Sequence, residues 1–474
     1  MTTFRSRFVL IALLGLGAVL RLVEAYRRPL QVDEALTLNL ADAPLRDALV
    51  YLRTEDVHPP LLTYALHMVE AWHVPDIAVR MAMALIGLAS VALLYYLVRL
   101  WADVTAASIA AVCAAFMPSL LFYDSWIRMY APFEFLALGS FVLLSLAVKN
   151  PGGRFALWFA WAICTALMWY TLYLGLVVTA GQLLFVIALR RSSLVYAIGA
   201  AGIAALLWLP QLATFVTQLP NGGVAWPWGL AHPLTALLEI PGGATLDPQY
   251  AGERLRVYAA VVAWSWLALA AFVAWRSSRS TLLPWLLAPS ILLVVYSLAF
   301  HKALYFERYH LLAADGLAAL TGVGVAALWN AKREWAMACA AAALIVLVSF
   351  SAAFALVPAF YTASWPSVAR IIATATQPQD LVVLEQGSSI HPLQRMGAFA
   401  NRSALTVFAA RDIPIALREI PKHRRVLYVS YQSDPVDPTN AVYTSLAAGR
   451  HVAGVWALRR ELPAENVDIT LFEK

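Results

Sequence analysis

The stretch FVLIALLGLGAVLRLVEAYRRPLQVDEALTLNL, residues 8–40, contains a long apolar run followed closely by two adjacent carboxylates. The run over residues 8–26 approaches the roughly 20 residues that an α-helix needs to cross a bilayer. It resembles a signal peptide in composition, but it lacks a small-residue cleavage site before the charged stretch. We therefore interpret it as a retained first helix. The pair Asp33–Glu34 then lies where the chain leaves the lipid.

The composition of the whole chain indicates a polytopic membrane protein. Of its 474 residues, 61% are hydrophobic and 13% are charged, which is about half the charged fraction of a soluble protein. This argues against a soluble protein with an unusually apolar core. The three cysteines, Cys113, Cys164 and Cys339, all lie in apolar runs, so we expect neither a disulfide framework nor a thiolate metal site.

The apolar runs predict about eleven transmembrane helices. The stretch 155–189 is too long for one crossing, and we divide it near Tyr170–Tyr173. The predicted helices cover residues 8–26, 78–98, 104–121, 131–148, 155–171, 173–189, 194–210, 255–275, 281–299, 311–329 and 335–357.

The charge distribution assigns the two sides of the membrane. With the N-terminus inside, every inner connection is short and carries Lys or Arg, as the positive-inside rule requires. The long segments 27–77, 211–254 and 358–474 then lie outside, and they hold all nine histidines except His301 and His310, which fall in a shorter outer turn. We expect the cytoplasmic membrane of a bacterium, with the polar chemistry on its exterior face.

The sequence predicts two domains, a transmembrane domain over residues 1–357 and an exterior domain over 358–474. In the tail, the apolar runs 381–386, 404–410 and 424–431 are typical of strands and alternate with polar segments. We expect a compact α/β or mainly β domain there.

The first outer loop, residues 27–77, predicts two helices at the membrane interface. Leu45, Leu49 and Leu52 recur at helical spacing. The turn His58-Pro59-Pro60 ends one helix and favours the start of another. Carboxylates and a histidine would then converge on one pocket at membrane level: Asp33, Glu34, Glu55, Asp56 and His58. The alternative is that Asp33 and Glu34 are ordinary solvated loop charges.

These motifs resemble those of GT-C glycosyltransferases that use polyprenyl-phosphate-linked sugars. The chain looks most like bacterial relatives of the protein O-mannosyltransferases and of the lipid A aminoarabinose transferase (glycosyltransferase families 39 and 83). The matching motifs are Val32-Asp33-Glu34-Ala35, His58-Pro59-Pro60-Leu61, Arg128-Met129-Tyr130-Ala131 and Arg308-Tyr309. Relatives often carry a glutamate where this chain has Trp126. The resemblance implies an all-α GT-C membrane fold with a small exterior domain.

The resemblance also implies an inverting transfer in which Asp33 is the general base, and the position of Asp33 agrees with that role. Glu34 and His58 would orient the loop or the acceptor, although Glu34 equally fits a helix N-terminal charge. Fixed cations must stabilise the leaving phosphate. The candidates for donor-phosphate binding are Arg128, Lys302, Arg308 and Tyr309. Arg128 could instead pair with Asp124, and the tyrosines could belong to an interfacial aromatic belt.

Cofactors and partners follow from this chemistry. Glu55, Asp56 and His58 could hold a divalent metal ion, although a His-Pro-Pro corner more often fixes a turn, so the sequence leaves open whether a metal is required. The expected partners are a polyprenyl-phosphate-linked sugar, a glycan, lipid or protein acceptor, and membrane lipids, but no nucleic acid. The sequence does not choose between hexosyl and pentosyl donors.

The main alternative function is a lipid-linked sugar transporter or flippase. Transporters place ionisable groups near the bilayer midplane and often contain repeats. Here the intramembrane ionisable residues lie near helix ends and no repeat is visible. An inactive scaffold that binds a lipid-linked sugar is a further alternative. Carboxylates gathered on one face favour an enzyme.

Overall fold

The apolar runs fold into helices, and the tail folds around a small sheet. The computed structural model describes residues 2–149, 155–219, 274, 281–300, 307–331, 334–357, 363–400, 402–431, 437–459 and 466–474. The described residues form two compact units. The helical unit contains the described parts of 1–26 and 41–356, and the α/β unit contains those of 27–40 and 357–474.

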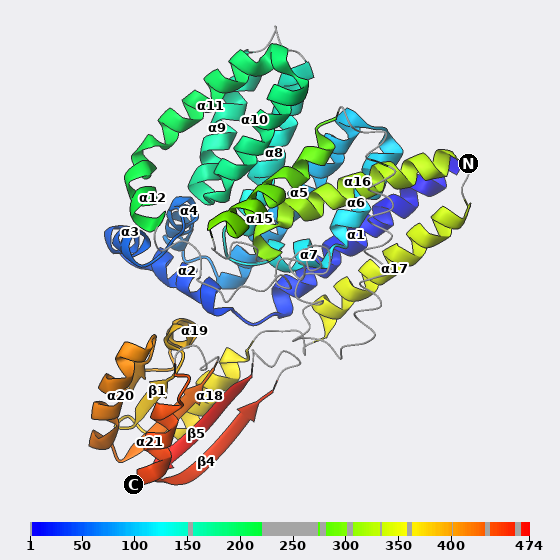
Figure 1. Ribbon diagram of the computed structural model, residues 1–474. Coiled ribbons are helices and arrows are strands. Elements are labelled where there is room, and N and C mark those ends of the chain that lie inside the picture. The colour runs from blue at the N-terminus through cyan, green and yellow to red at the C-terminus, as the bar shows by residue number, and fades with distance from the viewer. Residues whose placement is uncertain are drawn as a thin grey trace. The chain divides into compact units, whose positions relative to one another are not determined.

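The helical unit follows the predicted apolar runs closely. Six of its described helices are long and apolar enough to cross a membrane by length and composition, or seven if one bent pair is counted as a span. The predicted helix 255–275 lies outside the described residues apart from Ala274. Figure 1 shows α8 to α11 lying side by side. The described helices are α1 (Thr2–Arg27), α3 (Leu45–Thr54), α4 (Leu61–Glu70), α5 (Asp76–Trp101), α6 (Val104–Ala115), α7 (Pro118–Asp124), α8 (Tyr130–Lys149), α9 (Phe155–Thr171), α10 (Leu174–Leu189), α11 (Leu194–Trp208), α12 (Leu212–Gln218), α15 (Ala288–Phe300), α16 (Leu311–Asn330) and α17 (Glu334–Leu356).

The prediction of one continuous helix over 104–121 is wrong. The segment forms α6 and α7, which are bent by 63° at the break between them. Pro118 is the first residue of α7, and a proline cannot donate the hydrogen bond that the carbonyl four residues earlier would accept. That carbonyl belongs to Ala114, which accepts a long hydrogen bond from the backbone N–H of Met117 at 3.3 Å in place of its helical one.

Arg21 of α1 adds strong donors at this break. Its Nη2 donates to Ala114 O at 2.9 Å, and its Nη1 donates to Ala115 O. Its Nε pairs with Asp124 Oδ2 at 3.0 Å, and both side chains are almost fully buried. The last turn of α7 also packs closely against Gly87 of α5. Any side chain at position 87 would collide with Asp124, since a Cβ there would lie 2.3 Å from Asp124 Cγ. The bend is therefore held by a buried ion pair and by a position where only glycine fits.

Small residues allow α16 and α6 to approach closely. A Cβ on Gly322 would lie 2.3 Å from Ala106 O and 2.8 Å from Ala110 Cβ. Helix association in membranes depends on such close backbone packing, because lipid tails are as apolar as the side chains. This contact places α16, which carries Asp315, in the centre of the helical unit.

The first outer loop contains the two predicted helices and one more. Helices α3 and α4 flank the turn at Pro59–Pro60, as predicted, and Ala48 and Leu52 are the buried residues of α3. The additional helix is α2 (Val32–Asp42), which begins at the Asp33–Glu34 pair. Residues 27–40, which include most of α2, belong to the α/β unit.

The α/β unit contains a five-stranded mixed sheet in the order β2-β1-β3-β5-β4 (Figure 1). Strands β1 (Leu381–Leu384), β2 (Ser403–Thr406) and β3 (Arg425–Ser430) are parallel and correspond to the three predicted runs. Strands β4 (His451–Leu458) and β5 (Val467–Glu473) are antiparallel additions that the sequence analysis did not identify. The expectation of an α/β exterior domain is confirmed at the level of its fold.

Helices cover both faces of this sheet, so its central strands are apolar on both sides. Val382 and Leu384 face one core with α18 (Trp365–Ala375) and α19 (Ile390–Arg395). Leu381 and Val383 face the other core with α20 (Ile413–Glu419) and α21 (Ala441–Gly449). The continuous apolar strand β1 therefore results from a three-layer arrangement.

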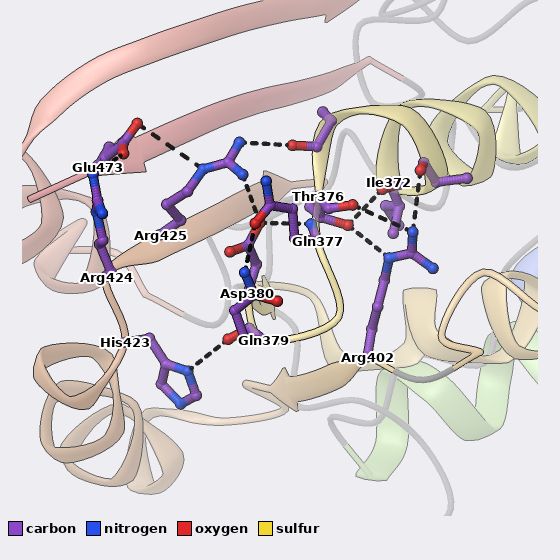
Figure 2. Close-up of polar contacts among 12 residues, drawn as sticks. Ile372, Thr376, Gln377, Gln379, Asp380, Arg402, His423, Arg424, Arg425 and Glu473 are labelled. Atoms are coloured by element: carbon purple, nitrogen blue, oxygen red, sulfur yellow. Dashed lines mark hydrogen bonds and ion pairs between the residues drawn. The ribbon is translucent and has the colours of Figure 1, made fainter.

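Two arginines tie the sheet to the end of α18 (Figure 2). Arg425 of β3 pairs with the buried Asp380 at 3.2 Å and donates to Ala375 O at 3.0 Å. Arg402 donates to Thr376 Oγ1 at 2.7 Å. Asp380 also accepts from the backbone N–H of Gln377 at 2.7 Å. These contacts fix the turn that leads into β1.

The buried Arg21–Asp124 pair predicts a non-additive effect on stability. Arg21→Gln leaves a buried carboxylate without its cation, which costs about 3 kcal/mol in comparable pairs. Asp124→Asn leaves the buried guanidinium of Arg21 without its carboxylate. Asparagine has the same size as aspartate, so this substitution keeps the close contact with Gly87. We expect the double variant to be more stable than the Arg21→Gln variant, as measured by thermal unfolding of the detergent-solubilised protein. Arg99→Gln, at an exposed site, is the control. Additive losses in the double variant would contradict this account of the bend.

Candidate active site

The turn between α3 and α4 builds the polar centre of the helical unit. His58 Nδ1 donates to Asp56 Oδ1 at 2.5 Å, and the backbone N–H of Val57 donates to the same oxygen at 2.6 Å. Burial raises the pKa of Asp56, but attraction to His58, the hydrogen bond from it and the nearby Arg128 outweigh burial and lower the pKa below its ordinary value. The carboxylate therefore stays ionised and fixes the imidazole.

Arg128 contributes the positive charge from the segment between α7 and α8. It is buried, and its charge acts on both Asp56 and Tyr51. Burial and the carboxylates of Asp56 and Glu55 raise the pKa of Tyr51, whereas Arg128 opposes this rise. Asp124, the other partner that the sequence offered for Arg128, forms a buried ion pair with Arg21.

His58 lines one end of an apolar cavity of about 200 Å³. It continues between α10, α12 and α15, and its wall includes Phe215, Leu293 and Tyr296. His58 and Tyr309 line the same cavity, so the structure brings two of the predicted site residues together. A cavity of this composition suits an alkyl or isoprenoid chain.

The polar rim of this cavity was not identified from the sequence. Gln211 Nε2 donates to Tyr173 Oη at 2.9 Å, and Tyr173 Oη donates to Gln218 Oε1 at 2.6 Å. Gln218 Nε2 then donates to Leu52 O of α3. Burying a side-chain amide costs free energy unless it is hydrogen-bonded. The glutamines within this apolar stretch were therefore the sequence feature that could have indicated a polar network. The network joins α3 to α12 beside the cavity.

Arg308, another predicted cation, lies in η7 (Glu307–Tyr309). Arg308 Cζ is 5.6 Å from the ring centroid of Tyr309, a cation–π distance. The segment η7 contacts α7, which precedes Arg128. Lys302 lies outside the described residues.

Glu34 has a structural role in the α/β unit. It lies in the first turn of α2 and is fully buried. Its Oε2 accepts from the backbone N–H of Gln31 at 2.9 Å, and its Oε1 lies 3.7 Å from Arg28 Nη2. The helix N-terminal alternative that the sequence left open is the arrangement observed.

Asp33, by contrast, is half-buried, and no described residue donates a hydrogen bond to its carboxylate. Its described neighbour is His391 at the start of α19, which interacts with it electrostatically. Asn39 Nδ2 of α2 donates to His391 O at 3.2 Å and fastens the two helices together. Burial lowers the pKa of His391, although Asp33 opposes the change. His391 was not identified from the sequence, because it lies over 350 residues away.

The predicted site residues therefore fall in two units. Asp33 and Glu34 belong to the α/β unit, whereas Glu55, Asp56, His58, Arg128, Arg308 and Tyr309 belong to the helical unit. Glu55 is exposed. Within the described ranges, no group of three or more His, Cys, Asp or Glu side chains is placed to hold a metal ion. Asp56 and His58 instead bind each other.

Comparison of the sequence with known proteins finds no match. No protein-family model matches the chain, and no curated protein matches it either.

Solved structures, however, match the chain over nearly its whole length. Apo ArnT from Cupriavidus metallidurans aligns with a TM-score of 0.55 and 12% identity, over 98% of each chain. The oligosaccharyltransferase AglB from Archaeoglobus fulgidus, in complex with an inhibitory peptide and a dolichol-phosphate, aligns with a TM-score of 0.56 and 12% identity. That alignment covers 98% of this chain and 74% of AglB. These likenesses concern the fold, and they confirm the fold that the motifs predicted: the chain has the GT-C fold of polytopic membrane proteins.

Proposed function

We propose that this protein is an integral membrane glycosyltransferase that uses a polyprenyl-phosphate-linked sugar. The observation that carries the proposal is the end-to-end similarity in fold to AglB and ArnT. One AglB structure contains a dolichol-phosphate, and one ArnT structure contains undecaprenyl phosphate. The acceptor would lie on the outer face of the cytoplasmic membrane, with the N-terminus inside and the α/β unit outside.

The helical unit supplies the chemistry that such a donor requires. The apolar cavity would hold the part of the isoprenoid chain nearest the phosphate. At its polar end, His58 and Tyr309 line the cavity, and Arg128 acts on the same Asp56 that binds His58. Guanidinium groups at this place would stabilise the phosphate as it leaves. Arg308 and Lys302 are further candidates for that contact.

The α/β unit supplies the proposed base. Asp33 would remove the proton from the acceptor hydroxyl, and a carboxylate without a hydrogen-bond donor among the described residues is suited to accept one. A single displacement with one base inverts the anomeric configuration. Glu34 would hold the first turn of α2 through its contacts with Gln31 and Arg28.

Release of free polyprenyl phosphate tests the proposal directly. The purified protein would be offered a panel of polyprenyl-phosphate sugars together with an acceptor-containing membrane extract. We expect Asp33→Asn to reduce release by roughly 10²- to 10⁴-fold, the range for loss of a general base. Asp47→Asn, an exposed carboxylate of α3, serves as the matched control. Equal release by the Asp33→Asn and wild-type proteins would move the base elsewhere. Movement of intact donor across vesicles without release would support the flippase alternative.

His391 predicts the acid side of the pH–rate profile. Because burial lowers its pKa, the imidazole is neutral at pH 7 and gains a positive charge only below the ordinary value of about 6.5. That charge would appear beside Asp33 and disfavour proton transfer to it. We therefore expect the wild-type rate to fall in this acidic range and His391→Gln to show a weaker fall. Identical profiles for the two proteins would exclude His391 as a group that acts on the base.

A further inference from the structure

A second cavity of the helical unit also reaches His58. It has a volume of about 570 Å³ and lies between α3, the start of α4 and the segment around Gln211. The polar side chains along its wall are Arg46, Arg53, His58, Tyr64, Gln211 and Thr214. Its volume falls in the range of sites that bind small molecules or parts of larger ones. The rest of the wall is apolar and includes Leu49 and Val50. His58 thus lines both cavities, and the second one adds two arginines to its apolar wall.

The wall of this second cavity is positively charged. Arg46 and Arg53 are seven residues apart on α3, which places them on one face of the helix. No Asp or Glu is among the residues that line the cavity. Within the part of the chain that the structure describes, neither arginine forms an ion pair or donates a hydrogen bond. Two guanidinium groups without carboxylates in one cavity favour an anionic ligand.

The difference in lining between the two cavities indicates which reactant each one would bind. A lipid-linked donor needs an apolar cavity for its chain, and the cavity lined by Phe215 and Leu293 provides one. The second cavity combines its arginines with the hydroxyl of Tyr64 and the amide of Gln211, which can form hydrogen bonds with a polar group of the ligand. Since His58 lines both cavities, a molecule in the second cavity would lie beside the donor.

We propose that Arg46 and Arg53 bind an anionic group, a phosphate or a carboxylate, on the acceptor. This inference rests on the proposed glycosyl transfer and narrows its acceptor to an anionic molecule. Each arginine can form a two-pronged hydrogen bond with such a group. Two other sources carry the same chemistry, namely the donor phosphate and the headgroup of an anionic membrane lipid, and the experiment must separate them.

Chemical footprinting of arginines tests the site without requiring turnover. The full-length protein in phosphatidylcholine nanodiscs is treated with phenylglyoxal, with and without inorganic pyrophosphate as the anionic probe, and modified peptides are quantified by mass spectrometry. We expect pyrophosphate to slow modification of Arg46 and Arg53 about fivefold, as for a site at high occupancy. The exposed Arg99 of α5 should react equally in both samples.

Two variants complete the test. Pyrophosphate should raise the thermal unfolding midpoint of the wild type but not that of Arg46→Gln/Arg53→Gln. The double variant Arg46→Lys/Arg53→Lys should retain part of the effect, because it keeps the charge. If the glutamine variant does not fold, the wild-type footprint and the lysine variant decide the question.

Three results would overturn the proposal. The first is equal modification of Arg46 and Arg53 with and without pyrophosphate. The second is protection at Arg128 or Arg308 instead, which would identify the donor-phosphate site. The third is protection that appears only when phosphatidylglycerol is added to the nanodiscs, which would identify a lipid headgroup. Protection at Arg46 and Arg53 without polyprenyl phosphate release from any donor would leave an anion site and reject the glycosyl transfer, so the two failures are distinguishable.

Discussion

The ion pair between Arg21 and Asp124 closes the break between α6 and α7, and much of the helical unit depends on it. Pro118 leaves a backbone oxygen without its helical partner, and a membrane-embedded backbone group without a partner costs several kcal/mol. Arg21 supplies a second, shorter hydrogen bond to Ala114 O, and Asp124 balances the charge of Arg21. Glu134 of α8 and Asp315 of α16 lie close enough to interact electrostatically with Asp124. Five helices are therefore arranged around one cation.

The bend between α6 and α7 also determines where the chain after α7 places Arg128. If 104–121 continued as a straight helix, the segment after Asp124 would follow a different course. The bend instead leads into the turn that carries Arg128, which acts on Asp56 and Tyr51. Asp124 of the buried ion pair thus precedes Arg128, the residue proposed to bind the donor phosphate, by only four positions in the chain.

Sequence reasoning identified the elements whose physics is local. Apolar length indicated the helices, consecutive prolines indicated the corner after His58, and uninterrupted apolar runs indicated β1 to β3. It did not identify the bend at Pro118, because the donors that stabilise it come from Arg21, far away in the chain. It also missed β4, an edge strand on which Val452 and Val455 are exposed. The neighbours of Asp33 could not be predicted for the same reason, because His391 comes close to Asp33 only in the tertiary fold.

The packing of α2 has a consequence for the modular design of this protein. Val32 packs against the core formed by α18, α19 and one face of the sheet, and Asn39 is hydrogen-bonded to His391 O. The residue assigned as the base is therefore carried by the α/β unit, although it directly follows the first helix in the chain. A chimera that exchanged only the tail after residue 357 would separate α2 from the surface on which it folds. The exchangeable module is discontinuous and consists of residues 27–40 together with the tail.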